Sequence, residues 1–271
     1  MLGLALSKFR SDNGLFLASA LAFNLLLYFI PLALLMISLL GYTVLDSERA
    51  MSEVQGVVQA FLPRSQQALA GNLSAVVADR GLLGFVGFAS FLVLSTLLFG
   101  AVRTVLSRVF QVPDQHTFFS GMAVDLLVMG LSMLLLLLVV ITTSFLTLVG
   151  TVAEQYPSWG AFLLPGVSVL GRFFGVGFTA LLLFVLYRFA PTSDMSTRAL
   201  LVASLTGTLL FQIARWGFAW YVRLAQDTLA LYGALGGVMF LFVWLYYASV
   251  VFILGAEVGW AYDQTAEDVS E

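Results

Sequence analysis

The chain has 271 residues, of which 61% are hydrophobic and only 10% are charged, and it contains no cysteine. A soluble domain averages about 45–50% apolar and about 25% charged residues, so this composition excludes an ordinary soluble enzyme, a disordered chain and a disulfide-stapled secreted domain. The net charge of -3 argues against a nucleic-acid-binding protein, which would carry a clustered basic face. The composition therefore predicts a polytopic membrane protein.

Six apolar stretches are each long enough to cross a hydrocarbon core of about 30 Å at a rise of about 1.5 Å per residue. None of them alternates between apolar and polar residues as a barrel strand would. We therefore predict an all-α membrane protein, with six transmembrane helices in one bundle and a single domain over residues 1–271. The predicted spans cover residues 15–42, 82–102, 122–149, 162–186, 199–222 and 231–260.

An even number of spans places both termini on the same side of the membrane. Basic residues near the ends of spans favour the cytoplasm for that side, because Lys and Arg concentrate in short cytoplasmic loops. On this topology, residues 263–271 form a short, solvated acidic tail. The long connection between the first two spans carries two helical apolar patterns, which predict two short amphipathic helices. They either rest on the rim of the bundle or form a lid.

Three stretches carry a family resemblance. The first span reads ALAFNLLLYFIPLALLMISLLGY, the second ends LLFGAVRTVLSRVF, and the last third contains LYRFAP, LLFQIARWGFAWYV and YGALGGVMFLFVWLYYASVVFILGAE. Together they resemble the YihY/BrkB family of bacterial inner-membrane proteins, some of which were once labelled ribonuclease BN. The resemblance covers most of the chain. It is most specific in the segments Tyr232–Gly236 and Gly255–Glu257.

The resemblance implies six spans, cytoplasmic termini and a multi-pass location in the bacterial cytoplasmic (inner) membrane. It does not supply a settled biochemical activity. Members of the family are linked to envelope integrity and serum resistance, and a role in moving envelope lipids has been proposed for them. In the family pattern a basic residue also stands in the fifth span, where this chain has Arg215.

Two arginines, Arg172 and Arg215, lie within predicted spans. A charge at the centre of a bilayer costs about 2.5–3.5 kcal/mol even on lenient scales, so such residues are candidates for function. On the predicted topology both lie in the outer half of the membrane, where no intramembrane carboxylate accompanies them. They either extend to lipid headgroups, pair with Glu154 or Asp227, or line a cavity that accepts an anionic substrate.

Two carboxylates, Asp125 and Glu257, fall in the inner half on the same topology. Arg103, Arg108 and Arg188 lie on that side and can neutralise them. Glu257 follows the end of an apolar run, so it lies either at the membrane interface or in a buried pair. A proton-coupling carboxylate is a further interpretation for either residue.

The first span contains two features that are unusual in lipid, Pro31 and Asn24. A proline inside a helix frees the carbonyl four residues earlier, here that of Leu27. Pro31 therefore marks either a static kink or a hinge, and Asn24 supplies a polar group that could join a substrate site.

Small residues predict where helices approach one another closely. Pairs spaced by four residues place them on one helix face, which is typical of helix packing in membranes. These pairs are Gly171 and Gly175, Ala203 and Gly207, and Gly255 and Gly259. Gly233 and Gly236, which open the last span, either pack or hold unwound backbone near a site.

Catalytic signatures are missing from the sequence. The single histidine, His116, has too few neighbouring ligands for a metal site, and no nucleophile elbow, phosphate loop or paired-acid motif occurs. We therefore expect no enzyme activity, no metal and no cofactor. The leading hypothesis is a transporter or flippase-like protein for an anionic envelope lipid or amphipathic solute. The alternative is a non-catalytic protein of envelope assembly or integrity. Expected partners are the lipid bilayer and an anionic lipid but no nucleic acid, and the sequence leaves a homo-oligomer open.

Overall fold

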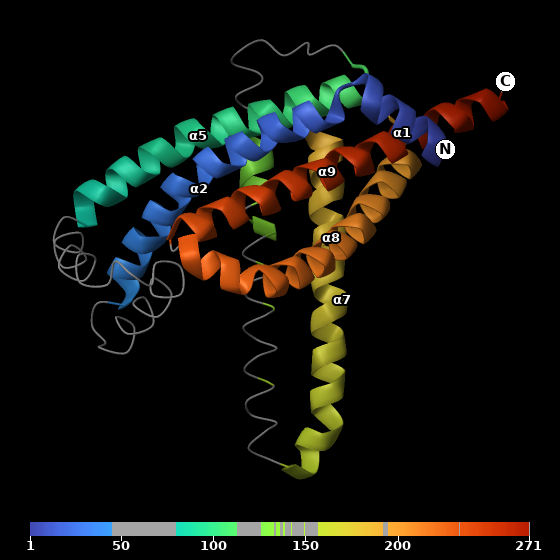
Figure 1. The fold of residues 1–271 in the computed structure, drawn as a ribbon. Coiled ribbons are helices and arrows are strands. Elements are labelled where there is room, and N and C mark those ends of the chain that lie inside the picture. Colours follow the sequence, from blue (N-terminus) through green and yellow to red (C-terminus); the bar gives the residue numbers. More distant parts are fainter. Residues whose placement is uncertain are drawn as a thin grey trace. The chain divides into compact units, whose positions relative to one another are not determined.

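Every element that the structure describes is a helix, as the composition predicts. The computed structural model describes residues 1–44, 80–112, 126–132, 157–191, 195–232 and 234–270, with a few positions between 134 and 149. Within some of these helices only the backbone is described. The helices with defined bounds are α1 (Leu2–Ser11), α2 (Gly14–Val44), α5 (Arg80–Val109), α7 (Pro157–Phe189), α8 (Thr197–Tyr232) and α9 (Ala234–Ser270) (Figure 1).

The helices match the predicted spans in position but are longer at several ends. Helix α8 continues ten residues past the predicted end of the fifth span, and α9 continues through Ser270, so the expected acidic tail is helical up to that residue. Polar residues that favour helix, such as those around Arg223, extend a helix beyond its apolar stretch. The two amphipathic helices predicted between the first two spans lie outside the described residues, as does most of the predicted third span.

Four helices in the described part of the chain are long and apolar enough to cross a membrane, or up to five if α1 and α2 form one bent span. The candidate spans are Phe88–Val109, Val169–Phe189, Thr197–Ala225 and Gly236–Ala266. This number is compatible with six spans, and six remains a prediction.

The chain divides into two compact units. The first contains Met1–Leu15, Val102–Ile213 and Val250–Glu271, and the second contains Phe16–Ala101 and Ala214–Ser249. Helices α5, α8 and α9 each contribute one part to each unit. The single domain predicted from the sequence therefore stays a prediction, and the units are treated separately below.

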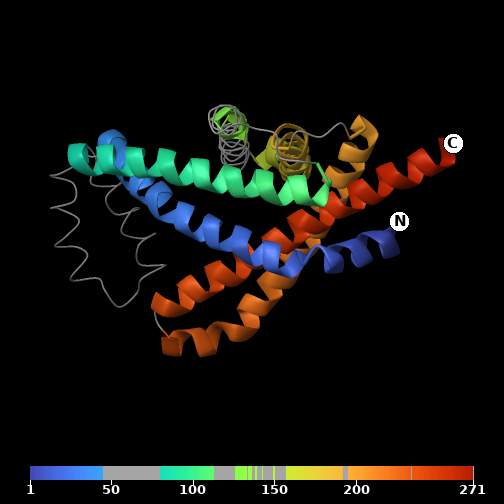
Figure 2. The same ribbon diagram turned by 90° about the horizontal axis from the view of Figure 1, so that it is seen from above.

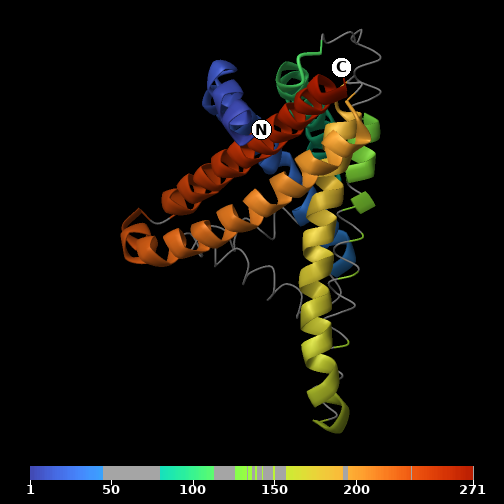
Figure 3. The same ribbon diagram turned by 90° about the vertical axis from the view of Figure 1, so that its right-hand side faces the viewer.

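In the first unit, the beginning of α8 and the end of α9 cross at small residues (Figure 3). The Cα atoms of Gly207 and Gly255 face each other so closely that a Cβ atom on Gly255 would lie 2.8 Å from the Gly207 Cα. One turn away, a Cβ atom on Gly259 would lie 2.5 Å from the Ala203 Cβ. The predicted pairs Ala203/Gly207 and Gly255/Gly259 thus pack against each other, and glycine is required because backbone occupies the space of a side chain.

Tyr187 of α7 closes this crossing from the side. Its side chain is fully buried, and its hydroxyl donates a hydrogen bond of 2.7 Å to the carbonyl oxygen of Phe252 on α9. The Tyr187 ring also lies 5.1 Å from the Phe252 ring and 6.4 Å from the Phe110 ring, centroid to centroid. One tyrosine therefore joins α7, α9 and the residue that follows α5.

We expect Tyr187→Phe to lower the free energy of unfolding by about 0.5–1.5 kcal/mol, the usual net value of one hydrogen bond. The ring contacts remain in this variant, so only the hydroxyl is lost. Denaturation in mixed detergent micelles, followed by circular dichroism, measures the difference. Tyr247→Phe is the control, because Tyr247, on α9, is exposed. Equal effects of the two variants would contradict the assignment.

In the second unit, α2 remains a continuous helix through Pro31, which is fully buried. Tyr28, one turn earlier, packs its ring against Phe91 of α5 at a centroid distance of 5.3 Å. The proline therefore lies inside an unbroken helix close to a packed contact between α2 and α5. The hinge interpretation of Pro31 stays a prediction.

Candidate functional site

A buried cluster of charges lies in the first unit, centred on Lys8 of α1. The Lys8 ammonium group is 2.5 Å from Asp12 Oδ2, 2.7 Å from the Val109 carbonyl oxygen and 3.2 Å from Glu257 Oε2. Lys8 donates hydrogen bonds to the oxygens of Asp12 and Val109 and forms an ion pair with Glu257. Its nitrogen also lies 4.6 Å from the centroid of the Trp260 ring, within range of a cation–π contact. We call Lys8, Asp12 and Glu257 the ion cluster.

The ion cluster is held by three helices that the chain brings from distant positions. Helix α1 lies alongside the C-terminal part of α9 (Figures 1 and 2), and Ala5 packs there against Val258 and Ala261. The carbonyl of Val109 comes from the last residue of α5. Because the Glu257 side chain is 0% exposed and that of Lys8 is 5% exposed, this ion pair is screened very little by solvent.

Helix α1 is oriented with Lys8 inward and its second charged residue, Arg10, exposed. Lys8 and Phe9 are buried, whereas Leu2, Leu4 and Leu6 are between 45% and 67% exposed. In a soluble protein this distribution would be unfavourable, since the apolar side chains would face water. In a membrane protein it suits lipid contact on one side and a buried ion pair on the other.

Glu257 was predicted either at the interface or in a buried pair, and its burial and pairing favour the latter. The cation beside it is Lys8, which was not among the predicted partners Arg103, Arg108 and Arg188. Trp260, which is partly buried, packs against Ala5, Val258 and Ala261 beside the cluster. The second predicted inner carboxylate, Asp125, lies outside the described residues.

The second unit contains a different kind of surface, on α8. Arg215, Ala219 and Arg223 recur at every fourth residue, and all three are exposed. Trp216 and Trp220 follow the same spacing on the neighbouring stripe and are 75% and 60% exposed. We call these five residues the arginine–tryptophan face. Side chains four residues apart lie on the same face of a helix, so the two guanidinium groups flank the small side chain of Ala219.

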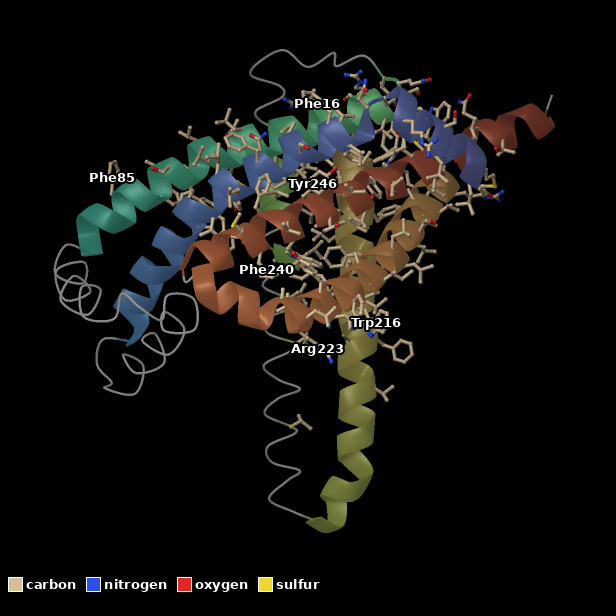
Figure 4. The ribbon with its side chains drawn as sticks, in the orientation of Figure 1. Phe16, Phe85, Trp216, Arg223, Phe240 and Tyr246 are labelled. Atoms are coloured by element: carbon tan, nitrogen blue, oxygen red, sulfur yellow. The ribbon has the colours of Figure 1, made fainter. Side chains whose placement is uncertain are left out.

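The opposite side of this part of α8 packs against α9. The Phe218 ring lies 5.9 Å from the Phe240 ring and 4.9 Å from the Trp244 ring, and the Tyr221 ring lies 5.3 Å from that of Phe240. Figure 4 shows Phe240 between α8 and α9, with Trp216 and Arg223 projecting from the other side of α8. This aromatic packing fixes the rotation of α8 in the second unit and leaves the arginine–tryptophan face exposed.

Arg215 has no protein counter-ion in the described part of the chain, and the sequence has no acidic residue within four positions of it. Arg223 likewise forms no ion pair with a described residue, and the side chain of Asp227, four residues later, lies outside them. The candidate span ends at Ala225. About 15 Å of helix therefore separates Arg215 from that end, at about 1.5 Å per residue.

The other predicted site residues are placed as follows. Arg172 lies in α7, in the first unit, and its side chain is outside the described residues. Arg215 belongs to the second unit, so the two arginines are not brought together within one unit. The side-chain amide of Asn24 donates a 2.9 Å hydrogen bond to the carbonyl of Ala20, on its own helix. One of the two amide hydrogens of Asn24 is thereby bonded within its own helix and needs no substrate to accept it.

The remaining predicted glycines differ from those of the α8–α9 crossing. Gly171 is half-buried in α7, whereas Gly175 is exposed, and a Cβ atom there would meet no described atom within 4 Å. Gly236 is buried within α9, and Gly233 lies outside the described residues. The pair Gly171/Gly175 thus has no close helix approach at its second member among the described atoms.

An all-helical protein with several membrane-length helices, a buried ion pair and exposed arginines and tryptophans within a candidate span is an integral membrane protein. The chain belongs to the family described as virulence factor BrkB, whose model matches residues 5–271. This finding agrees with the resemblance noted in its sequence.

Curated relatives carry the name UPF0761 membrane protein. One from Pseudoalteromonas atlantica is 28% identical over 251 residues, covering 89% of this chain and 78% of its own length. Another, from Alteromonas mediterranea, is 26% identical over 263 residues, covering 95% of this chain and 85% of its own. A third, from Aliivibrio salmonicida, is 26% identical over 242 residues, covering 89% and 76% respectively. These names describe a membrane protein and mention no enzymatic activity. No solved structure is significantly similar to the chain.

Proposed function

We propose that this membrane protein binds an anionic envelope lipid at the arginine–tryptophan face of α8 and moves it between the two leaflets. The supporting observation is that Arg215 is exposed within a candidate span and has no counter-ion among the described residues. An uncompensated guanidinium group in hydrocarbon is costly, and a lipid phosphate supplies the missing charge. Guanidinium donors match phosphate oxygens in geometry, and they do so without losing their proton.

The neighbours of Arg215 suit the remainder of a lipid. Ala219 leaves room for a headgroup between Arg215 and Arg223, because its side chain is a single methyl group. Trp216 and Trp220 offer flat apolar surfaces for acyl chains, and indoles favour the depth at which headgroups meet hydrocarbon. An amphipathic ligand with one anionic group would therefore contact both kinds of side chain on one helix.

The proposal keeps the six-span topology and the cytoplasmic termini predicted from the sequence. It also keeps the expectation that the protein is not an enzyme and uses no cofactor. Movement of the lipid requires access to both leaflets, and α8 extends over the full length of a candidate span. A role of Arg172 of α7 in substrate binding stays a separate prediction, which rests on its position within a predicted span.

Native mass spectrometry of the protein in phosphatidylglycerol nanodiscs tests lipid binding. We expect the wild type to retain phosphatidylglycerol and Arg215→Ala/Arg223→Ala to retain about ten- to hundred-fold less. This range corresponds to about 1.5–3 kcal/mol for a hydrogen bond to a charged group. Arg198→Ala is the matched control, because Arg198 is exposed on the same helix but lies outside the face. Equal retention by the three proteins would exclude the site.

Movement is tested separately, in proteoliposomes that contain fluorescent phosphatidylglycerol. We expect the wild type to expose inner-leaflet label to an external quencher faster than protein-free vesicles do, and the double arginine variant to lose this increase. Binding without movement would support the alternative function, a non-catalytic protein of envelope assembly. That alternative is favoured by the tight α8–α9 crossing, which provides a rigid scaffold.

A further inference from the structure

The ion cluster contains one positive and two negative side chains. Lys8 contacts both carboxylates, at 2.5 Å for Asp12 and 3.2 Å for Glu257. With all three groups ionised, the cluster has a net charge of -1 by this count. A buried net charge is unfavourable because the protein interior solvates it poorly. Binding of one positive charge would make the cluster neutral.

The geometry shows where that charge would bind. Both carboxylate oxygens of Glu257 are fully buried, and neither has a hydrogen-bond partner among the described residues; Oε2 has only the ion-pair contact with Lys8. An ionised carboxylate has acceptor positions on both oxygens, so this group is left without the donors that a buried anion requires. Asp12, in contrast, retains some exposure, at 18% of its side chain. The unmet requirement therefore lies at Glu257 and not at Asp12.

Among the described residues, no other charged group on the surrounding helices pairs with Glu257. The charged groups in this part of the chain that act on it are Lys8 and Asp12. Val109, at the end of α5, offers a carbonyl oxygen that accepts a hydrogen from Lys8. On α7, the Tyr187 hydroxyl donates its hydrogen to the carbonyl of Phe252. On α8, the residues that contact α9 at Gly259 are Ala199 and Ala203, which carry no charge. Arg198 and Arg108 are exposed, and Asp263 accepts a hydrogen bond from Ser196.

We propose that Glu257 is a proton-binding site of this protein, and that Lys8 loses its ionic contact with Glu257 and stays paired with Asp12 when the proton binds. Without the proton, ionised Glu257 is paired with Lys8. A hydronium ion then transfers its proton to Glu257: one O–H bond of hydronium breaks, an O–H bond forms on Glu257, and water is released. This step cancels the charge of Glu257, and Lys8 remains neutralised by Asp12 while it donates to the Val109 carbonyl. Asp12 is the acidic member with access to solvent. No other bond forms or breaks, and the net charge of the cluster changes from -1 to zero.

Protonation of Glu257 has a structural consequence for α1. Loss of the Lys8–Glu257 attraction removes the ionic contact between α1 and α9 and leaves the apolar contact of Ala5 with Val258 and Ala261. Protonation of Glu257 is therefore expected to loosen α1 from α9. This inference is independent of lipid binding at α8, since the two sites belong to different units and are tested with different variants.

Infrared difference spectroscopy during a pH titration of the full-length protein in nanodiscs tests the proposal. We expect the wild type to show a protonated-carboxyl band that grows as the pH falls, and Glu257→Gln to lose the contribution of one carboxyl group per chain. Asp263→Asn is the matched control, since Asp263 is on the same helix but hydrogen-bonds to Ser196 outside the cluster. If Glu257→Gln retains the complete band of the wild type, Glu257 does not bind the proton and the proposal is overturned.

A second measurement separates proton binding from a purely structural role. Spin labels at Ser7 of α1 and Tyr262 of α9 report the distance between these helices. We expect a pH-dependent shift in this distance in the otherwise wild-type protein and its loss when Glu257→Gln is added. If Glu257→Gln does not fold, both experiments use Lys8→Met/Glu257→Gln instead of the single variant. This double variant removes both partners of the ion pair. A distance that does not change with pH in the otherwise wild-type protein would overturn the coupling to α1.

Discussion

Replacement of Lys8 by methionine is expected to lower the free energy of unfolding by about 3–5 kcal/mol, the usual cost of removing one partner of a buried ion pair. Methionine fills similar space but leaves Glu257, which is 0% exposed, without its cation. The carbonyl of Val109 also loses its hydrogen-bond donor. The size of the effect comes from the charge left behind, because most of the attraction within the intact pair is offset by desolvation.

One matched control changes another residue of α1, and the other changes both members of the Lys8–Glu257 pair. Arg10→Met removes a basic residue from the exposed side of α1 and should change the free energy of unfolding by no more than about 0.5 kcal/mol. Lys8→Met/Glu257→Met removes both charges and should recover most of the stability lost in the single variant. Denaturation in mixed detergent micelles measures all three. A Lys8→Met effect as small as that of Arg10→Met would show that the cluster does not contribute to the folded state.

Gly255→Ala is expected to destabilise the protein by about 1–3 kcal/mol, as overpacking of a tight core does. The new Cβ atom would lie 2.8 Å from the Gly207 Cα and 2.8 Å from the Tyr187 hydroxyl oxygen. Atoms this close repel strongly, and the Gly207 contact is to backbone, which cannot rotate away. The two helices must therefore separate, and the hydrogen bond from Tyr187 to Phe252 weakens with them.

Gly175→Ala provides the comparison, because a Cβ atom at that position meets no described atom within 4 Å. Alanine has a higher helix propensity than glycine, so this variant should be neutral or slightly stabilising. Gly255→Ala/Tyr187→Phe should lose less stability than the sum of its single variants, since one of the two close contacts has been removed. Thermal unfolding of the variants in detergent tests both statements. Equal melting temperatures for Gly255→Ala and Gly175→Ala would contradict the close crossing.

The helices could be predicted from the sequence because the bilayer imposes a simple condition on the backbone. Every peptide group in hydrocarbon must form its hydrogen bond within the chain, so a long apolar stretch such as residues 169–189 becomes a helix. The ends of the helices were predicted less well, because this condition applies only within hydrocarbon. Outside hydrocarbon this condition no longer applies, and helix propensity extended α8 to Tyr232 and α9 to Ser270.

The candidate sites divide along a similar line. Arg215 could be found from the sequence, since an ionisable residue within an apolar stretch stands out by composition. That its side chain faces away from α9 depended on the packing of Phe218 against Phe240 and Trp244. Sequence reasoning also identified Gly255 and Gly207, but not that they would face each other. Lys8 gave no such signal, because it stands in a short mixed segment at the N-terminus, and only its inward orientation makes it distinctive.

By itself, the sequence determined the class of protein, the positions of the membrane-length helices and the residues whose presence in lipid requires an explanation. These properties are local, because hydrophobicity and backbone hydrogen bonding act within one helix. The tertiary structure decided which cation pairs with Glu257, which glycines meet at the α8–α9 crossing and which arginines remain exposed. Those properties depend on contacts between residues far apart in the chain, such as Lys8 and Glu257, and on how each helix is rotated by the side chains packed against it.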